Sequence, residues 1–286
     1  MNVELSNIEM VSAKIQSLWS SWLNTKDKSL LINNKDLILH IIDLLDKGLI
    51  RIAEKQNDNW VINYWIKQSI LMYFIIQECK IIEANLNDIK WFDKIDHKCK
   101  NWTQEDFIAS GMRVVPGAFI RYGAFIDKSS IIMPSFVNIG VFVGNNSMID
   151  SMTTIGSCAQ IGNNTHISAQ VCIGGVLEPI VANPTIIEDN CFIGSNCSIT
   201  EGVIIKKGAI IASNVSISQS TKIIDRLTGK ITYGVIPENA VVVSGSVRIN
   251  DSLSMYAVII VKYVDEQTRQ KTTMNDILRF DLNNEE

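Results

Sequence analysis

Residues 187–217 read IEDNCF IGSNCS ITEGVI IKKGAI IASNVS I, with isoleucine at every sixth position from Ile187 to Ile217. The same spacing holds upstream from Val137 to Ile173, through Val143, Ile149, Ile155, Ile161 and Ile167. A period of six fits neither the roughly 3.6-residue turn of an α-helix nor the alternation of an ordinary strand. It is typical of hexapeptide repeats, which wind a chain into a parallel β-helix.

The residue types within each repeat support a narrow coil. The fourth residue after each aliphatic one is small or compact, as at Cys191, Cys197 and Ala209. Isoleucine and valine favour packed strands, and one repeat cannot bury its aliphatic side chain alone. Successive coils must therefore stack, so that the aliphatic side chains fill the interior.

Two breaks in the repeat are informative. The period already runs from Val114 to Ile132, but the next step, to Val137, is five residues, so the register slips there. The step from Ile173 to Ile187 is fourteen residues instead of twelve. The excess predicts an extruded loop at residues 174–185. Loops on a rigid scaffold often carry function, so this segment is the best candidate for site residues.

The flanking segments have other patterns. Apolar residues recur at spacings of three and four in residues 8–23 and 36–45, which predicts helices, and residues 64–79 form a strongly apolar third helix. Residues 51–63 are expected to form a short hairpin. We therefore predict a mainly α-helical N-terminal domain at 1–110, which could cap the open end of the coil.

The β-helix is assigned to residues 111–247 and a C-terminal extension to 248–286. Within and beyond the last coils, residues 225–230 are typical of a hairpin tip and residues 241–247 and 257–264 of strands. Residues 273–280 are expected to form a terminal helix.

Composition excludes several classes of protein. The net charge is −4 and the pI about 5.5, which argues against a nucleic-acid partner. No secretory signal and no membrane-spanning apolar run is recognisable, so we expect a soluble, cytoplasmic protein without membrane contact. The six cysteines have no metal-ligand spacing, and Cys191 and Cys197 are expected in the core of a reduced protein. No metal site is predicted.

Several motifs go beyond a generic repeat. They include Arg113-Val114-Val115-Pro116, Gly156-Ser157-Cys158-Ala159-Gln160-Ile161-Gly162, Ile173-Gly174-Gly175-Val176-Leu177-Glu178-Pro179, Ile187-Glu188-Asp189-Asn190-Cys191-Phe192-Ile193-Gly194 and Gln219-Ser220-Thr221-Lys222-Ile223. With them, the chain closely resembles the tetrahydrodipicolinate N-succinyltransferases, hexapeptide-repeat acyltransferases of lysine and diaminopimelate biosynthesis. The resemblance runs essentially from end to end.

This resemblance implies a left-handed parallel β-helix and a homotrimer, with active sites in the grooves between neighbouring prisms. The implied reaction transfers the succinyl group of succinyl-CoA to the amine of ring-opened tetrahydrodipicolinate. Succinyl-CoA would be a co-substrate, and no tightly bound cofactor and no metal are expected.

The resemblance also implies roles on the acceptor side. Arg113 matches the substrate-binding arginine, and a guanidinium is suited to grip one of the two acceptor carboxylates. Asp150 matches an acceptor-binding carboxylate and is the candidate base, because the attacking amine must lose a proton. Glu178 is a plausible acceptor contact or loop-ordering residue. The alternative to these roles is that Arg113 is a solvated charge at the start of the coil and Asp150 a hydrated aspartate at one of its corners.

On the donor side, Gly174 and Gly175 would let backbone amides approach the thioester or the pantetheine arm. Lys222, together with Lys206 and Lys207, is a candidate for the CoA phosphates, although all three also suit a solvated surface.

One position departs from the family pattern. A catalytic glutamate is expected four residues after Gly194, but Ser198 stands there, and Glu201 is the nearest carboxylate. A weakened enzyme or a non-catalytic scaffold therefore stays open as an alternative. A second alternative is an acetyl-CoA-dependent acyltransferase with His166 as base, because His166 lies in the coil, where it could also be an outward histidine with a local hydrogen bond. A γ-type carbonic anhydrase is disfavoured because His166 is the only histidine within the coil. A sugar-nucleotide uridylyltransferase is disfavoured because residues 1–110 lack a Gly-rich nucleotide-binding motif.

Overall fold

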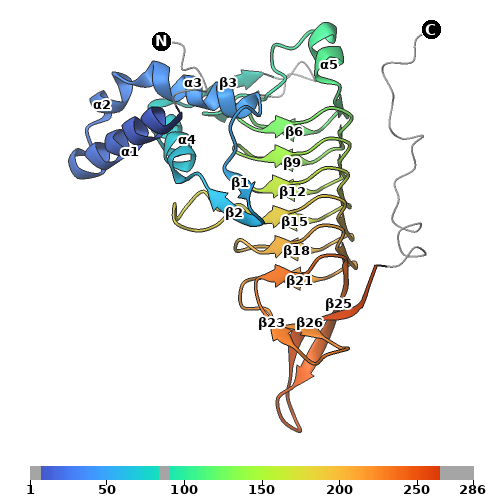
Figure 1. The fold of residues 1–286 in the computed structure, drawn as a ribbon. Coiled ribbons are helices and arrows are strands. Elements are labelled where there is room, and N and C mark those ends of the chain that lie inside the picture. The colour runs from blue at the N-terminus through green and yellow to red at the C-terminus, as the bar shows by residue number, and fades with distance from the viewer. Residues whose placement is uncertain (1–7, 84–89, 265–286) are drawn as a thin grey trace.

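The computed structural model describes residues 8–83 and 90–264, and its main body is a three-sided prism of stacked coils (Figure 1). Each side is a parallel sheet with strands in register. Face A contains β7 (Phe125–Ile126), β10 (Phe142–Val143), β13 (Gln160–Ile161), β16 (Ile186–Ile187), β19 (Ile204–Ile205) and β24 (Val235–Ile236).

Face C contains β6 (Phe119–Ile120), β9 (Phe136–Val137), β12 (Thr154–Ile155), β15 (Cys172–Ile173), β18 (Ser198–Ile199) and β21 (Ser216–Ile217). Face B contains β5 (Arg113–Val114), β8 (Ile131–Ile132), β11 (Met148–Ile149), β14 (His166–Ile167), β17 (Phe192–Ile193), β20 (Ile210–Ile211) and β25 (Ala240–Arg248), and continues into β26 (Ser254–Tyr263), β22 (Ile223–Asp225) and β23 (Ile231–Thr232). The chain passes from A to B to C, so three edges separate the faces: A–B, B–C and C–A.

The repeat explains the prism. The aliphatic residue of each repeat is the second residue of its strand, and from Ile120 to Ile217 all of them point inward and are buried in one continuous core. The register slip is confirmed, because β8 ends at Ile132 and β9 ends at Val137. These observations confirm the predicted architecture, a left-handed β-helix of hexapeptide repeats preceded by a helical region.

Asparagines occupy many corners of the prism. Asn146, Asn164, Asn196 and Asn214 all have a positive φ, a conformation that asparagine tolerates better than most residues. Their amides also bond from coil to coil, Asn146 Nδ2 donating to Asn164 Oδ1 at 2.7 Å and Asn196 Nδ2 to Asn214 Oδ1 at 2.7 Å. The corners therefore add hydrogen bonds along the coil axis.

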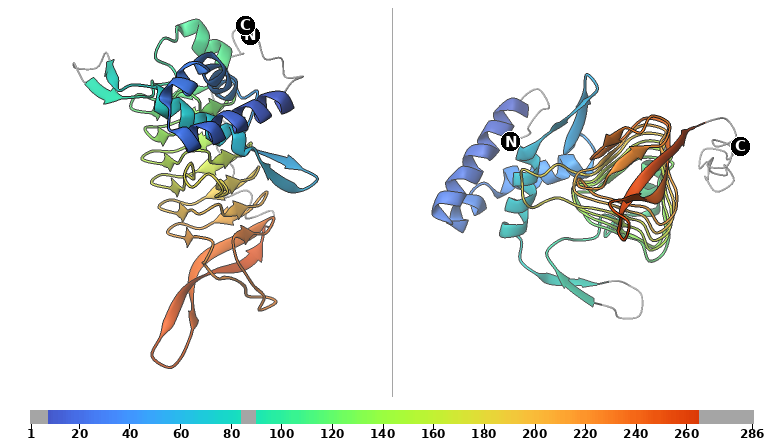
Figure 2. Two further views of the ribbon diagram at one scale, coloured as in Figure 1. Left: turned by 90° about the vertical axis from the view of Figure 1, so that its left-hand side faces the viewer. Right: turned by 90° about the horizontal axis from the view of Figure 1, so that it is seen from below.

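The N-terminal region packs beside the prism (Figure 2). Its elements are α1 (Ile8–Thr25), α2 (Lys28–Ile32), α3 (Lys35–Asp46), the antiparallel hairpin β1 (Ala53–Gln56) and β2 (Asn59–Ile62), and α4 (Tyr64–Ile76). Their apolar core includes Ile139 and Cys158, two residues of the C–A edge. The predicted helices and hairpin are therefore confirmed, with α4 ending three residues before the predicted boundary.

A second hairpin, β3 (Lys80–Glu83) with β4 (Lys90–Asp93), and the short α5 (Gln104–Ser110) precede the first coil. Sequence reasoning did not single out either element. α5 lies over the N-terminal end of the prism, and Trp102 just before it packs against the coil interior (Figure 1). The suggested capping role therefore belongs to this segment, while α1 to α4 cover a side of the prism.

At the other end, β25 and β26 form a long antiparallel ribbon, and β22 and β23 form the hairpin expected around residues 225–230. The helix predicted at residues 273–280 lies outside the described residues. Among those described, no helix combines the length and apolar character needed to cross a membrane.

Candidate active site

Asp150 follows β11 at the B–C edge, in the outward position expected. Its backbone amide donates to Ile167 O at 2.9 Å, and its Oδ1 accepts from Ser151 N at 2.6 Å. Its Oδ2 lies 3.9 Å from His166 Nε2, and both side chains are partly exposed. The bond from Ser151 N orients the carboxylate, and Oδ2, which is beyond hydrogen-bond distance of the imidazole, remains for a proton.

Ser198 lies on face C and points outward. Its strand neighbours at the same register are Cys172 on one side and Ser216 on the other, so no carboxylate replaces the missing glutamate on this face. Glu201 lies in the next turn, with a positive φ, and its Oε2 accepts from Gln219 N at 3.2 Å. Glu201 therefore bonds the turn of the next coil instead of facing Ser198.

The predicted loop leaves the prism at the C–A edge, between β15 and β16. Lys67 of α4 anchors it. This lysine is fully buried, and its Nζ donates to the carbonyl oxygens of Ile180 at 2.7 Å and Ala182 at 2.8 Å, with a longer contact to Pro179 at 3.4 Å. Burial lowers the pKa of the Lys67 ammonium. An ammonium has three N–H donors, so Lys67 can bond all three loop carbonyls at once.

Sequence reasoning missed Lys67 and treated the apolar helix only as core. The available signal was a lone lysine within an otherwise apolar segment, because a lysine is almost never fully buried without polar partners. Those partners belong to a loop more than a hundred residues away, so the sequence could not supply them.

Glu178 lies exposed in this loop, on a different edge from Asp150. Gly174 and Gly175, at the start of the loop, have a structural reason to be glycine. A Cβ on Gly175 would lie 2.3 Å from Ser157 N, and one on Gly174 would lie 2.8 Å from Thr200 Cα. Coil stacking alone therefore demands both glycines, whatever ligand they approach.

Arg113 is exposed on β5, at the N-terminal end of face B. It lines a hollow of about 620 Å³ together with Phe107, Ile108 and Ile131. Two strand spacings separate β5 from β11, which places Arg113 and Asp150 of one chain roughly 10 Å or more apart. Lys222 lies far along the coil, before β22, where its carbonyl accepts from Val258 N at 2.9 Å.

The six candidate residues are thus spread over one prism. Asp150 is at the B–C edge, while Gly174, Gly175 and Glu178 are at the C–A edge, and face C with Ser198 lies between them. The structure therefore does not bring all of them together within one chain. Within the described residues, no cluster of His, Cys, Asp and Glu has the geometry of a metal site.

The structure confirms that Cys191 and Cys197 lie in the core, as predicted. Cys191 and Cys197 are buried, unpaired, and their thiols donate to carbonyl oxygens of the next coil, Lys206 O at 3.2 Å and Ala212 O at 3.0 Å. Burial raises the pKa of the Cys191 thiol to about 12, so this thiol stays protonated and unreactive.

Comparison with known proteins places this chain in a family. Residues 10–76 match the family described as "Tetrahydrodipicolinate N-succinyltransferase N-terminal", and residues 184–219 match "Hexapeptide repeat of succinyl-transferase". A 2,3,4,5-tetrahydropyridine-2,6-dicarboxylate N-succinyltransferase of Wolbachia sp. subsp. Brugia malayi is 46% identical, over 95% of this chain and 99% of that protein. The chain belongs to the tetrahydrodipicolinate N-succinyltransferase family.

Another relative of the same name, from Acinetobacter baylyi, is 52% identical over 83% of this chain and 86% of its own length. Membership of the succinyltransferase family confirms the resemblance read from the motifs. It also confirms the acyltransferase class.

Proposed function

We propose that this chain transfers the succinyl group of succinyl-CoA to the amine of ring-opened tetrahydrodipicolinate, giving N-succinyl-2-amino-6-oxopimelate for lysine and diaminopimelate biosynthesis. The observation that carries the proposal is the match to a named succinyltransferase over nearly the whole of both chains. Succinyl-CoA enters as a co-substrate.

In this reaction the acceptor nitrogen attacks the thioester carbonyl, a C–N bond forms and the C–S bond breaks. CoA leaves as a thiolate and becomes the thiol by taking up the equivalent of the proton that the amine loses. The attacking amine loses one proton. Asp150 is our choice to accept it, because its side chain is partly exposed and Oδ1 accepts from Ser151 N, which leaves Oδ2 for the proton. The His166 ring packs edge-on against Phe192, with 5.2 Å between the ring centroids, which limits its rotation.

The separation of the candidates supports a homotrimer. In one chain, Asp150 and the loop with Glu178 lie on opposite sides of face C. If two prisms pack side by side, the B–C edge of one faces the C–A edge of the next, and a groove forms between them. Asp150 and Arg113 would then hold the acceptor against Gly174, Gly175 and Glu178 of a neighbour, with Lys222 near the CoA phosphates.

His166 beside Asp150 also keeps an acetyltransferase reading open, since an imidazole is an effective base near neutral pH. Thiol release from succinyl-CoA and from acetyl-CoA, each with tetrahydrodipicolinate, separates the two. We expect kcat/KM to be at least tenfold higher with succinyl-CoA. Preference for acetyl-CoA would refute the succinyl assignment.

Ser198→Glu tests whether the chain is a weakened enzyme or a scaffold. The side chain is outward and half-buried between two small neighbours, so a glutamate fits there. A positioned acid or base contributes about 10²–10⁴-fold, so we expect kcat to rise at least tenfold. Ser216→Glu, one coil further on the same face, is the matched control and should not raise kcat. Absence of turnover in wild type and in Ser198→Glu would favour a scaffold.

A further inference from the structure

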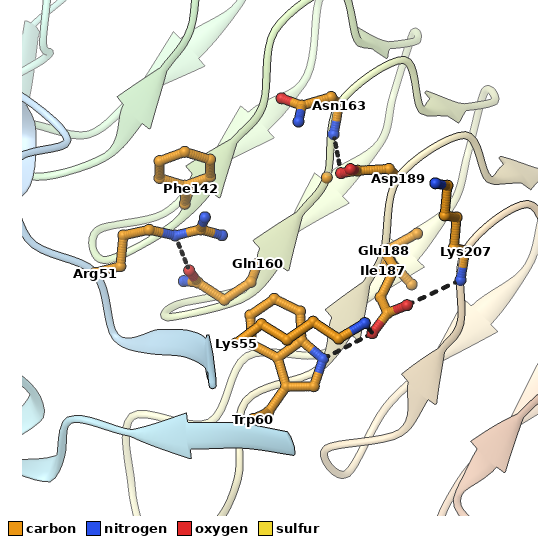
Figure 3. Close-up of a pocket in the computed structure, with 11 residues that line it drawn as sticks. Arg51, Lys55, Trp60, Phe142, Gln160, Asn163, Ile187, Glu188, Asp189 and Lys207 are labelled. Carbon is orange, nitrogen blue, oxygen red and sulfur yellow. Dashed lines mark hydrogen bonds and ion pairs between the residues drawn. The ribbon is translucent and has the colours of Figure 1, made fainter. Parts of the chain in front are cut away.

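A cavity of about 270 Å³ lies where the hairpin β1–β2 meets the prism (Figure 3). We call it the seam cavity. Its prism wall is formed by face A and the A–B edge, through Phe142, Gln160, Glu188 and Asp189, and its hairpin wall begins at Arg51. The B–C and C–A edges, which carry Asp150 and Glu178, are the other two edges of the prism. The seam cavity therefore lies apart from Asp150 and Glu178, and of the residues considered for the active site only Lys207 lines it.

Arg51 is the unusual group in this cavity. Its guanidinium carbon lies 3.5 Å from the Phe142 ring centroid, and its Nε donates to Gln160 Oε1 at 3.2 Å. Its two terminal nitrogens make no hydrogen bond or ion pair with any described residue, and Figure 3 shows them pointing into the space between the lining side chains. Burial lowers the pKa of this guanidinium to about 10, against the opposing charges of Glu54 and Asp189. The cation has therefore lost water without gaining a direct counter-ion.

A second stacked arginine at the N-terminal end of the prism shows what is absent. Arg121 also lies over an aromatic ring, 5.6 Å from the Phe136 centroid, and its Nη2 bonds Asp93 Oδ2 at 2.9 Å. Among the described residues, a carboxylate bonds Arg121 and none bonds Arg51.

The carboxylates near Arg51 are already engaged. Glu188 is almost fully buried and accepts from Trp60 Nε1 at 2.9 Å, from Lys55 Nζ at 3.1 Å and from Lys207 N at 3.0 Å. Asp189 Oδ1 accepts from Asn163 N at 2.7 Å. Both acids therefore bind the hairpin or brace the turns.

We propose that the seam cavity binds a small carboxylate ligand, held by the two terminal nitrogens of Arg51 and by contact with Phe142. The planar guanidinium fork matches a carboxylate through two parallel hydrogen bonds. Among the residues that line the cavity, the cationic side chains of Arg51, Lys55 and Lys207 outnumber the carboxylates of Glu188 and Asp189. Both carboxylates already accept hydrogen bonds from other groups. The volume is below the roughly 300–1,000 Å³ of sites for drug-sized molecules, so the ligand must be small.

Such a ligand would join two parts of the fold. Arg51 immediately precedes the hairpin, and Gln160 belongs to the prism, so a bound carboxylate would fasten the N-terminal region to face A. We therefore expect the ligand to stabilise the folded chain and to slow amide exchange in residues 51–62, from Arg51 to the end of β2.

The test uses the full chain and propionate as the probe, at pH 7.5 and constant ionic strength set with chloride. We expect a saturable rise in Tm of roughly 2–4 °C at ten times the Kd, with slower exchange in the hairpin. Inorganic phosphate at the same ionic strength is the comparison for a tetrahedral anion. A shift with phosphate equal to or larger than that with propionate would overturn the assignment to carboxylates.

Variants locate the binding. Arg51→Gln should abolish the response, and Arg51→Lys, which keeps the charge but not the fork, should weaken binding at least tenfold. Arg121→Gln is the matched control and should bind propionate with the wild-type Kd. Unchanged binding in Arg51→Lys, or an equal response in Arg51→Gln, would show that propionate binds elsewhere and would refute the proposal.

Discussion

Lys67→Met tests whether the N-terminal region orders the loop at residues 174–185. The substitution keeps the length and apolar stem of the side chain but removes the ammonium, whose two short bonds hold the carbonyls of Ile180 and Ala182. Hydrogen bonds that involve a charge contribute about 1.5–3 kcal/mol each. Part of this is recovered, because methionine avoids the cost of burying an ammonium. We expect the ordered loop to lose about 1.5–3 kcal/mol net.

If the loop must be ordered for turnover, this loss corresponds to a roughly 10- to 100-fold fall in kcat/KM. Amide exchange at residues 174–185, measured by mass spectrometry, should accelerate by a similar factor, while exchange in the coils stays unchanged. Thiol release from succinyl-CoA gives kcat and KM for the same samples.

The control is Ser69→Ala, on the same helix. Ser69 is also fully buried, but its hydroxyl bonds Trp65 O within the helix and does not contact the loop. Ser69→Ala should leave loop exchange and kcat/KM at wild-type values. If Lys67→Met changes both quantities by less than twofold, the lysine does not position the loop. If Ser69→Ala reproduces the defect, general loosening of α4 is the cause.

Asp150, Glu188 and Gly175 each allow a further test. Asp150→Asn removes the proposed base and should lower kcat by about 10²–10⁴-fold with an unchanged Tm, and a kcat within threefold of wild type would exclude that role. Burial acts to raise the pKa of Glu188, but bonds from Trp60, Lys55 and Lys207 N hold this pKa below its usual 4.5. The ionised Glu188 therefore stabilises the folded hairpin fully above about pH 4.5, and this stabilisation is lost as the pH falls below that value. The fluorescence of Trp60, measured in a variant whose other tryptophans are phenylalanine, should report release of the hairpin in acid. Glu188→Gln should abolish that transition. Gly175→Ala places a Cβ 2.3 Å from a backbone nitrogen of the neighbouring coil and should lower Tm by several degrees, and an unchanged Tm would show that the coils can shift apart there.

The coil was predictable because its information is local and repeated. Each buried isoleucine occupies the same place in its own repeat, so spacing alone identifies the interior, the slip before Val137 and the loop before Ile187. The outward position of Asp150 followed from the same register. The position of Glu178 in the extruded loop and the serine at position 198 could likewise be read from the sequence.

The contacts between distant segments were not predictable. The cation in α4 that anchors the loop, the glutamate that fastens the hairpin, and the arginine that faces the seam cavity all act across more than a hundred residues. The sequence around Lys67, Glu188 and Arg51 does not predict which residues they contact. The assignment of α5 as the cap also needed the fold, because a seven-residue helix carries little periodic signal.

The sequence by itself determined the prism, its inward and outward positions and the family to which the chain belongs. These properties depend on residue type at a fixed period, because the aliphatic side chain of each repeat is buried only when the repeats stack as coils. Tertiary structure alone decided which charged side chains meet and which remain without a counter-ion. Burial and pairing of charges depend on surfaces that come together only when the helical region docks on the prism, and no local pattern encodes that docking.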